Sequence, residues 1–361
     1  MITQQTFKQS GFTVVELMVS IMLGLLLVAG VVQVYLGSQT TYRVTEGLSR
    51  MQENTRSSAE LLAKDIRMAG YIPCSQPSDS SLVINADADD WWAQLFEQPI
   101  RGYDGDASTS SFPAEIASDA KVGSDAIVIL RAGAKVAGVE LFDVANQQFV
   151  LQRNVPTNWL EDGSLMVACD STRSRLFQAS AFSNTRVTVA GVGGTLSPGN
   201  ASAINQVFGT DSQIANYSAV VYFVSQSSSG NGFSLYRRYL NVNTAGNSVV
   251  AAAEELAEGI ENMQLLYGYD GNDDGSAEQY IKADNALLTG SNIANWQNVA
   301  SVKIGLLYAS ADGLREGQDD NYSYIVANTT IGPSSSSETV THAVDQRKRY
   351  VASMTVSLRN L

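Results

Sequence analysis

The chain of 361 residues has few of the side chains on which most catalysis and metal chemistry depend. It contains one histidine, His342, and two cysteines, Cys74 and Cys169, which stand far apart in the sequence. These counts exclude zinc-finger spacings and give no support to the Ser/His/Asp or Cys/His arrangements of nucleophilic enzymes. We therefore expect a protein that is not an enzyme.

Positive charge is also scarce. The sequence has 23 Lys and Arg against 36 Asp and Glu, so its formal net charge is −13. A nucleic-acid-binding surface needs clustered cations to neutralise phosphates, so no nucleic acid is expected as a partner. Hydrophobic residues make up 44% of the chain, which is enough for an ordinary globular core.

No proline occurs before Pro73, and the segment from Leu17 to Leu36 has only three polar side chains, Ser20, Gln33 and Tyr35. A run of about 20 residues can cross the hydrocarbon core of a bilayer as a helix. A cleaved secretory signal is disfavoured because the run is too long and no Ala-x-Ala-like site follows it. A plain membrane anchor explains the length of the run. It leaves Glu16 unexplained, because a lone carboxylate in the first turn is costly in lipid.

A third interpretation accounts for Glu16. A short polar leader with one basic residue, Lys8, ends at Gly11, and Phe12 follows. Glu16 is then the fifth residue after a cut behind Gly11. This arrangement resembles the class III signal of type IV pilins and pseudopilins.

That resemblance implies a processing and assembly mechanism. A membrane peptidase would cleave after Gly11, and the new amine of Phe12 would be methylated. The cationic amine would then neutralise Glu16 of a neighbouring subunit as helices pack into a filament. Because desolvation offsets most of the attraction between buried charges, the pair would set register more than it would add stability.

Residues 37–70 predict an amphipathic continuation of the same helix. Apolar and small side chains recur at steps of three and four and form one face for a core: Val44, Leu48, Met51, Thr55, Ser58, Leu62 and Ile66. Without an interrupting proline, the helix is expected to run from Phe12 to about Ala69 and to end at Gly70.

The rest of the chain is rich in short β-type runs separated by turn residues. Asp104-Gly105-Asp106 indicates a turn, and the glycines at 191–194 indicate a loop, because no Lys-Ser/Thr follows them as in a phosphate loop. Strands are expected at 126–130, 139–142, 149–151, 165–167, 187–189, 302–307 and 349–360, with a hairpin of 220–224 and 233–240. The expected fold class is α+β: a pilin-like N-terminal helix packed on a large, mainly antiparallel β head, with room for two sheets.

Two stretches narrow the resemblance to one family. The helix end Lys64-Asp65-Ile66-Arg67-Met68-Ala69-Gly70-Tyr71, with Cys74 after it, is similar to the R-D-I-R-M-A-G-Y pattern of PilW, a minor pilin of type IV pili. The second half carries a V-Y-F-V strand, an L-Y-R-R strand, an E-G-I-E-x-x-Q turn and an L-Y-G-x-D strand, which also resemble PilW. The resemblance covers residues 10–74 and 218–361 and is weak between 75 and 217.

The PilW resemblance implies a division of the chain and a function. The expected parts are a leader (1–11), a membrane or filament-core half of the helix (12–36), its amphipathic half (37–70) and the head (71–361). The implied protein primes assembly of a type IV pilus, sits at or near its tip and supports twitching motility or adhesion. It would start in the inner membrane with a periplasmic head and end in the extracellular pilus.

The implied partners are the prepilin peptidase, other minor pilins, the major pilin and a tip adhesin. Two alternatives stay open: a pseudopilin of a type II secretion system, and a membrane-anchored, calcium-dependent adhesin outside any filament. Export of the head also favours a disulfide between Cys74 and Cys169, since in the cytosol such a pair would stay as two buried thiols.

One acidic loop could bind a metal. Oxygen-bearing residues alternate as in the first half of an EF-hand loop, at Asp270, Asn272, Asp274, Ser276 (through its carbonyl) and Glu278. The twelfth position is Ile281, where an EF-hand has a bidentate Glu, and a strand precedes the loop, so it is not an EF-hand. A Ca²⁺-binding strand connection and a water-satisfied acidic turn are both compatible with the sequence.

Overall fold

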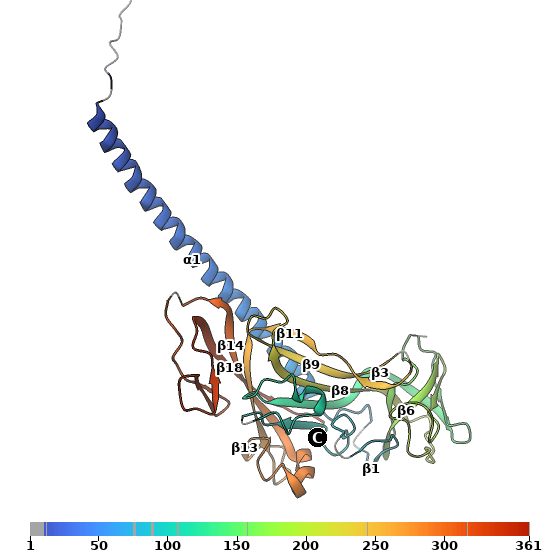
Figure 1. Ribbon diagram of the computed structural model, residues 1–361. Coiled ribbons are helices and arrows are strands. Elements are labelled where there is room, and N and C mark those ends of the chain that lie inside the picture. The colour runs from blue at the N-terminus through green and yellow to red at the C-terminus, as the bar shows by residue number, and fades with distance from the viewer. Residues whose placement is uncertain are drawn as a thin grey trace, which may run out of the picture. The chain divides into compact units, whose positions relative to one another are not determined.

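The structure is a computed structural model that describes Gly11 and residues 13–74, 77–87, 90–106, 108–156, 158–243, 245–315 and 317–360. Its long helix, α1 (Val14–Arg67), is followed by a head made mostly of antiparallel strands (Figure 1). The α+β, pilin-like fold expected from the sequence is therefore confirmed. The chain divides into two compact units, Met1–Arg50 and Met51–Leu361, so α1 contributes to both.

The helix ends close to the predicted position. Arg67 is its last residue, and Met68–Gly70 form a turn. Gly70 has a φ of +72°, a left-handed conformation that costs glycine little because it has no Cβ. Its N–H donates to the Leu130 carbonyl at 2.9 Å, which ties the helix end to a strand of the head.

The head has eighteen strands and two short helical elements among the described residues. Their bounds are β1 Asp79–Leu82, β2 Ile100–Tyr103, α2 Ala114–Ala117, β3 Ala126–Asp143, β4 Gln148–Leu151, β5 Leu165–Cys169, β6 Arg173–Ser183, β7 Arg186–Val189, β8 Gln213–Gln226, β9 Phe233–Val242, β10 Ser248–Val250, β11 Glu254–Glu258, β12 Ile260–Tyr269, β13 Gln279–Ile281, the 3₁₀ helix η1 Gly290–Asn298, β14 Val299–Gly313, β15 Tyr324–Val326, β16 Thr329–Pro333, β17 Val340–His342 and β18 Arg347–Ser357.

A central sheet forms the middle layer of the head. In it β2, β3, β8 and β9 lie side by side, and the predicted hairpin of β8 and β9 is confirmed by pairs from Val220–Tyr239 to Gln226–Phe233. Alternate side chains of β3 and β8 enter two different apolar clusters, because successive residues of a strand point to opposite faces. Both faces of this sheet are therefore covered.

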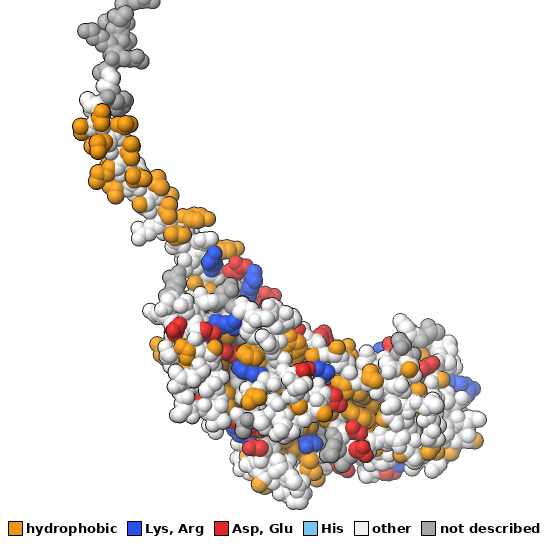
Figure 2. All heavy atoms as spheres, viewed as in Figure 1, with side chains coloured by type: hydrophobic (Ala, Val, Ile, Leu, Met, Phe, Trp, Pro, Cys, Tyr) orange, Lys and Arg blue, Asp and Glu red, His pale blue; other side chains and the backbone are white. Residues whose placement is uncertain are grey.

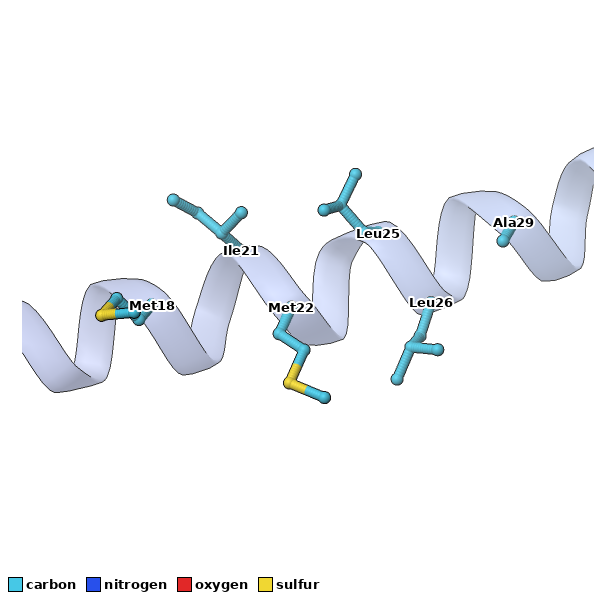
Figure 3. A pocket seen from close by; sticks show the side chains of 6 residues that line it. All are labelled: Met18, Ile21, Met22, Leu25, Leu26 and Ala29. Carbon is cyan, nitrogen blue, oxygen red and sulfur yellow. The ribbon is translucent and has the colours of Figure 1, made fainter.

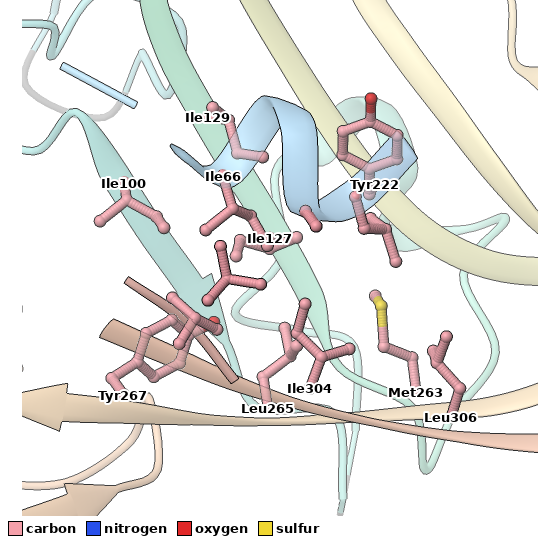
Figure 4. Packing of buried hydrophobic residues seen from close by; sticks show 14 of the residues in the cluster. Ile66, Ile100, Ile127, Ile129, Tyr222, Met263, Leu265, Tyr267, Ile304 and Leu306 are labelled. Carbon is pink, nitrogen blue, oxygen red and sulfur yellow. The ribbon is translucent and has the colours of Figure 1, made fainter. Parts of the chain in front are cut away.

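One face of the central sheet packs on α1 and on a second sheet, ordered β13-β12-β14-β18. Figure 4 shows Ile66 of α1 above this core, with side chains of the central sheet and of β12 and β14 around it. The other face is covered by residues 91–96 and 112–117, whose buried anchors are Trp91, Leu95, Phe112 and Ile116. A small third sheet, β15-β16-β17, carries its own cluster with Leu307 of β14.

The region with weak resemblance to PilW closes into a barrel. Strand pairings run from β3 through β8, β5, β6, β7 and β4 and return to β3, so this barrel of six strands has no free edge between its members. Phenylalanines pack together inside it, with the Phe149 and Phe177 ring centroids 5.3 Å apart. The strands predicted at 126–130 and 139–142 are one continuous strand, β3, which belongs to both the central sheet and the barrel.

Candidate functional site

The N-terminal segment begins with a reciprocal cap on α1. Thr13 precedes the first helical residue, and its hydroxyl oxygen accepts the Glu16 N–H at 3.3 Å. In return, the Glu16 carboxylate accepts the Thr13 N–H at 2.9 Å and the Thr13 hydroxyl at 3.0 Å. This is a capping box, which satisfies backbone donors that the first turn of a helix leaves unpaired. Gly11 is exposed, and Phe12 lies outside the described residues.

The first half of α1 exposes a continuous apolar surface (Figure 2). Within the helix, an 18-residue window reaches a mean hydropathy of 2.5 and none of it is buried, so by length and composition this segment can cross a membrane. Figure 3 shows side chains of one part of this surface, which borders a shallow apolar hollow: Met18, Ile21, Met22, Leu25, Leu26 and Ala29. In water such a surface would be costly, so it needs lipid or other helices against it.

The second half of α1 is fixed in the head. Met51, Leu62 and Ile66 are buried in the core between the two sheets. Polar contacts also fix the orientation of this half of the helix. The Tyr222 hydroxyl donates to Asp65 Oδ2 at 2.6 Å, and the hydroxyls of Ser58 and Tyr308 lie 2.7 Å apart. Burial, with a smaller contribution from the Asp65 charge, raises the pKa of Tyr222, so its hydroxyl keeps the proton that it donates.

The two cysteines form the predicted disulfide. Cys74, just after the helix end, is bonded to Cys169 at the end of β5, with a Cα–Cα distance of 5.9 Å. The bond links the helix end to a barrel strand that is 95 residues further along the chain.

The acidic loop after β12 brings together some of the predicted ligands. Carboxylate oxygens of Asp270, Asp274 and Glu278 lie within 4.8 Å of one another. Asn272 is beside them and donates to Asp274 Oδ2 at 3.2 Å, while Ser276 contributes its N–H to Asp274 Oδ1 at 2.8 Å.

The loop also has an internal hydrogen-bond system. Asp270 is 5% exposed, and its two oxygens accept the N–H groups of Asp274 and Gly275. Glu278 accepts the Gly271 N–H at 2.7 Å. The turn therefore has partners for these carboxylates without a cation, and the calcium hypothesis stays a prediction.

The sequence analysis missed a buried charge cluster that explains part of the family pattern. Glu261, in the E-G-I-E-x-x-Q stretch, forms a two-pronged ion pair with Arg349 of β18, with N–O distances of 2.5 and 3.1 Å. Arg349 also contacts Asp320 and Asp345, at 3.2 and 2.8 Å. The available signal was a pair of opposite charges in two strand-like stretches. The sequence does not show that β12 and β18 both lie next to β14, one on each side of it.

Comparisons with known proteins agree with these features. A capped, exposed apolar helix that continues into the core of a β head defines a pilin-like protein. Residues 6–32 match the prokaryotic N-terminal methylation motif, and residues 221–360 match the family of type IV pilus-assembly protein W. The two matches together support a minor pilin of type IV pili of the PilW type. No curated protein and no solved structure matches the chain.

Proposed function

We propose that the chain is a minor pilin that primes assembly of a type IV pilus and takes a place at or near its tip. One observation carries the proposal: a single helix begins in the methylation-motif segment and ends among strands of the PilW-matching region. A helix with an apolar first half and a head-bound second half can move from a bilayer into a filament without refolding. The tip position comes from the PilW resemblance.

In this proposal the N-terminal segment carries the assembly chemistry. Peptidase cleavage after Gly11 frees the amine of Phe12, which is methylated and pairs with Glu16 of a neighbouring subunit. The apolar face around Met22 and Leu25 then packs on helices of other minor pilins and of the major pilin. Before assembly the head stands in the periplasm, and afterwards it is outside the cell.

The barrel is the candidate surface for a partner specific to this chain. Most of it precedes residue 221, so it lies outside the region that matches the family. The head would present it to other minor pilins or to a tip adhesin.

Deletion and complementation in the source bacterium test the function. The proposal expects loss of surface pili on deletion, restoration by the wild-type gene, and the protein in sheared filaments. Normal pili with a defect in protein secretion would instead indicate a type II pseudopilin. Normal pili with lost adhesion would indicate a membrane-anchored adhesin.

A further inference from the structure

A second group of carboxylates lies inside the head, on residues outside the loop at 270–278. Strand β2 pairs with β3 so that Gly102 faces Ile127 and Tyr103 faces Ala126. The next step of this register places Asp104 opposite Asp125. Carboxylate oxygens of Asp104, Asp106 and Asp125 all lie within 4.8 Å of one another.

This group is largely shielded from water, with Asp125 buried and the Asp106 side chain 20% exposed, and it carries excess negative charge. Asp125 is 3% exposed, and the Asp104 side chain is 10% exposed. Among the described residues, Lys282 is the one cation within ion-pair distance, 3.4 Å from Asp104 Oδ2 and in contact with Asp106. Three carboxylates and one ammonium leave an excess of two negative charges, which is costly in a site shielded from water.

Asp125 ties the group to the second sheet. Its oxygens accept the N–H of Gly105 at 3.1 Å and the N–H of Leu265, in β12, at 2.8 Å. Burial, strengthened by the nearby Asp104 charge, raises the pKa of Asp125 well above its usual value. A proton on Asp125 would relieve only one of the two excess charges.

Tyr267 gives an independent sign that something is bound there. Its side chain is fully buried, and its hydroxyl has no hydrogen-bond partner within the described part of the chain. The hydroxyl fills the space beside Gly102 where a Cβ would stand. Since Gly102 and Asp104 are two residues apart and so point to the same side of the strand, the hydroxyl lies next to the Asp104–Asp125 pair.

One carboxylate oxygen shares this condition. Asp106 Oδ1 is buried and accepts no hydrogen bond within the same described residues, whereas Asp104 Oδ2 has the Lys282 ammonium 3.4 Å away. Buried polar atoms without partners are rare in folded proteins, and each one calls for a bound ion or water. Two of them, the Tyr267 hydroxyl and Asp106 Oδ1, together with the excess negative charge, indicate a polar ligand with positive charge.

We propose that Asp104, Asp106 and Asp125 bind one hard divalent cation, with Ca²⁺ as the best fit, next to the Tyr267 hydroxyl. A charge of +2 cancels the excess, and carboxylate oxygens are the ligands that Ca²⁺ prefers. Waters complete the coordination shell, and one of them gives the Tyr267 hydroxyl a hydrogen-bond partner. Because Asp125 contacts β12 and Lys282 follows β13, the cation fastens the two sheets that enclose the end of α1. The inference does not depend on pilus assembly.

The test uses the full chain in detergent micelles, stripped with EDTA and then titrated with CaCl₂ or MgCl₂. An Asp274→Ala background removes a ligand from the loop at 270–278, so a remaining response belongs to the buried group. Calcium is expected to raise the unfolding temperature in this background, because a ligand that binds only the folded state stabilises it. No calcium response in this background would overturn the proposal.

Two substitutions give opposite expectations. Asp106→Asn keeps the shape and removes one ligand charge, so it should weaken Ca²⁺ binding about tenfold. Lys282→Met removes the competing ammonium, so it should tighten binding. Calcium affinity left unchanged by both substitutions would also overturn the proposal. Terbium luminescence gives a second readout. The ring centroids of Tyr267 and Trp296 lie 4.7 Å apart, and both side chains can sensitise a nearby Tb³⁺.

Discussion

The Glu16 carboxylate holds both the backbone N–H and the hydroxyl of Thr13, at 2.9 and 3.0 Å, within a single chain. Glu16 therefore has a local partner as a helix cap before any neighbouring subunit arrives. Its proposed assembly role needs a test that separates its charge from its capping function.

Three substitutions make that separation. Glu16→Gln removes the charge but can still cap, since Gln serves at this position of a capping box. Thr13→Val removes the capping hydroxyl and keeps the charge. If the charge drives assembly, Glu16→Gln and Glu16→Ala should both lose incorporation into sheared filaments, while Thr13→Val keeps it. If Glu16→Ala and Thr13→Val lose incorporation while Glu16→Gln is incorporated normally, assembly depends on the helix cap and not on the charge.

Processing is expected to depend on Gly11. In Gly11→Leu the side chain blocks the position behind which the peptidase cuts, so the precursor should accumulate uncut in the membrane. Mass spectrometry of wild-type filaments should find methylated Phe12 at the N-terminus. Filaments that contain intact Met1 would contradict the pilin assignment, and Gly24→Leu, deeper in the apolar helix, is a control that leaves the cleavage position unchanged.

The disulfide should contribute strongly to stability. Closing a loop of 95 residues is worth about 4–5 kcal/mol in the chain-entropy model, and native strain reduces that value. We expect the double variant Cys74→Ala, Cys169→Ala to unfold at clearly lower urea concentration. Alkylation of the unreduced native protein should label neither cysteine, and labelling of both would show that the bond is absent.

The acidic loop at 270–278 should bind Ca²⁺ only weakly, because it lacks a bidentate Glu. A dissociation constant on the order of 10⁻⁴–10⁻³ M is typical of such extracellular sites. In an Asp106→Asn background, about 10 mM calcium should then stabilise the protein by roughly 1–3 kcal/mol. Asp274→Ala should reduce that gain, and what remains belongs to the buried group, which Asp106→Asn weakens without abolishing. An unmoved melting temperature in the Asp106→Asn background would make the loop an acidic turn.

Lys121 should make the free energy of unfolding depend on pH in the alkaline range. Its Nζ donates to the Glu261 carbonyl at 2.7 Å and lies 4.1 Å from the Phe233 ring centroid. Burial lowers the pKa of Lys121 to about 8, against about 10.4 for an unfolded lysine. Between these values the unfolded chain binds more protons, so this residue makes stability rise with pH.

The measurement compares urea unfolding of the wild type and of Lys121→Met at pH 7.5 and pH 10. Over this interval the free energy of unfolding of the wild type should rise by on the order of 2 kcal/mol relative to that of the variant. Lys303→Met, at a half-buried lysine of β14, is the control. Parallel curves for wild type and Lys121→Met would show that the Lys121 ammonium is not destabilised by its surroundings.

The sequence predicted the elements whose signals are local. The apolar run, the glycine at the helix end and the turn between β8 and β9 each depend on a few neighbouring residues, and all three appear in the structure. The disulfide followed from the expected compartment rather than from geometry. The capping box has a local signature too, Thr13-x-x-Glu16, and could have been predicted from these two residues.

The missed features depend on strand order. Closure of the barrel requires β3 to pair with both β4 and β8, and no short pattern encodes that choice. The Glu261–Arg349 pair joins strands on either side of β14. The sequence analysis treated Asp104-Gly105-Asp106 only as a turn, because Asp125 and Tyr267 come next to it through pairing of distant segments.

The position of the disulfide has a mechanical consequence. A tensile load on α1 is transmitted along the backbone to Tyr71 and Cys74. From Cys74 the disulfide passes it directly to Cys169 in the barrel. The 95-residue span between the cysteines is therefore bypassed and cannot be drawn out. Without the bond, that span could extend by roughly 300 Å before the load reached β5. The bridge thus makes the connection between helix and barrel short and inextensible.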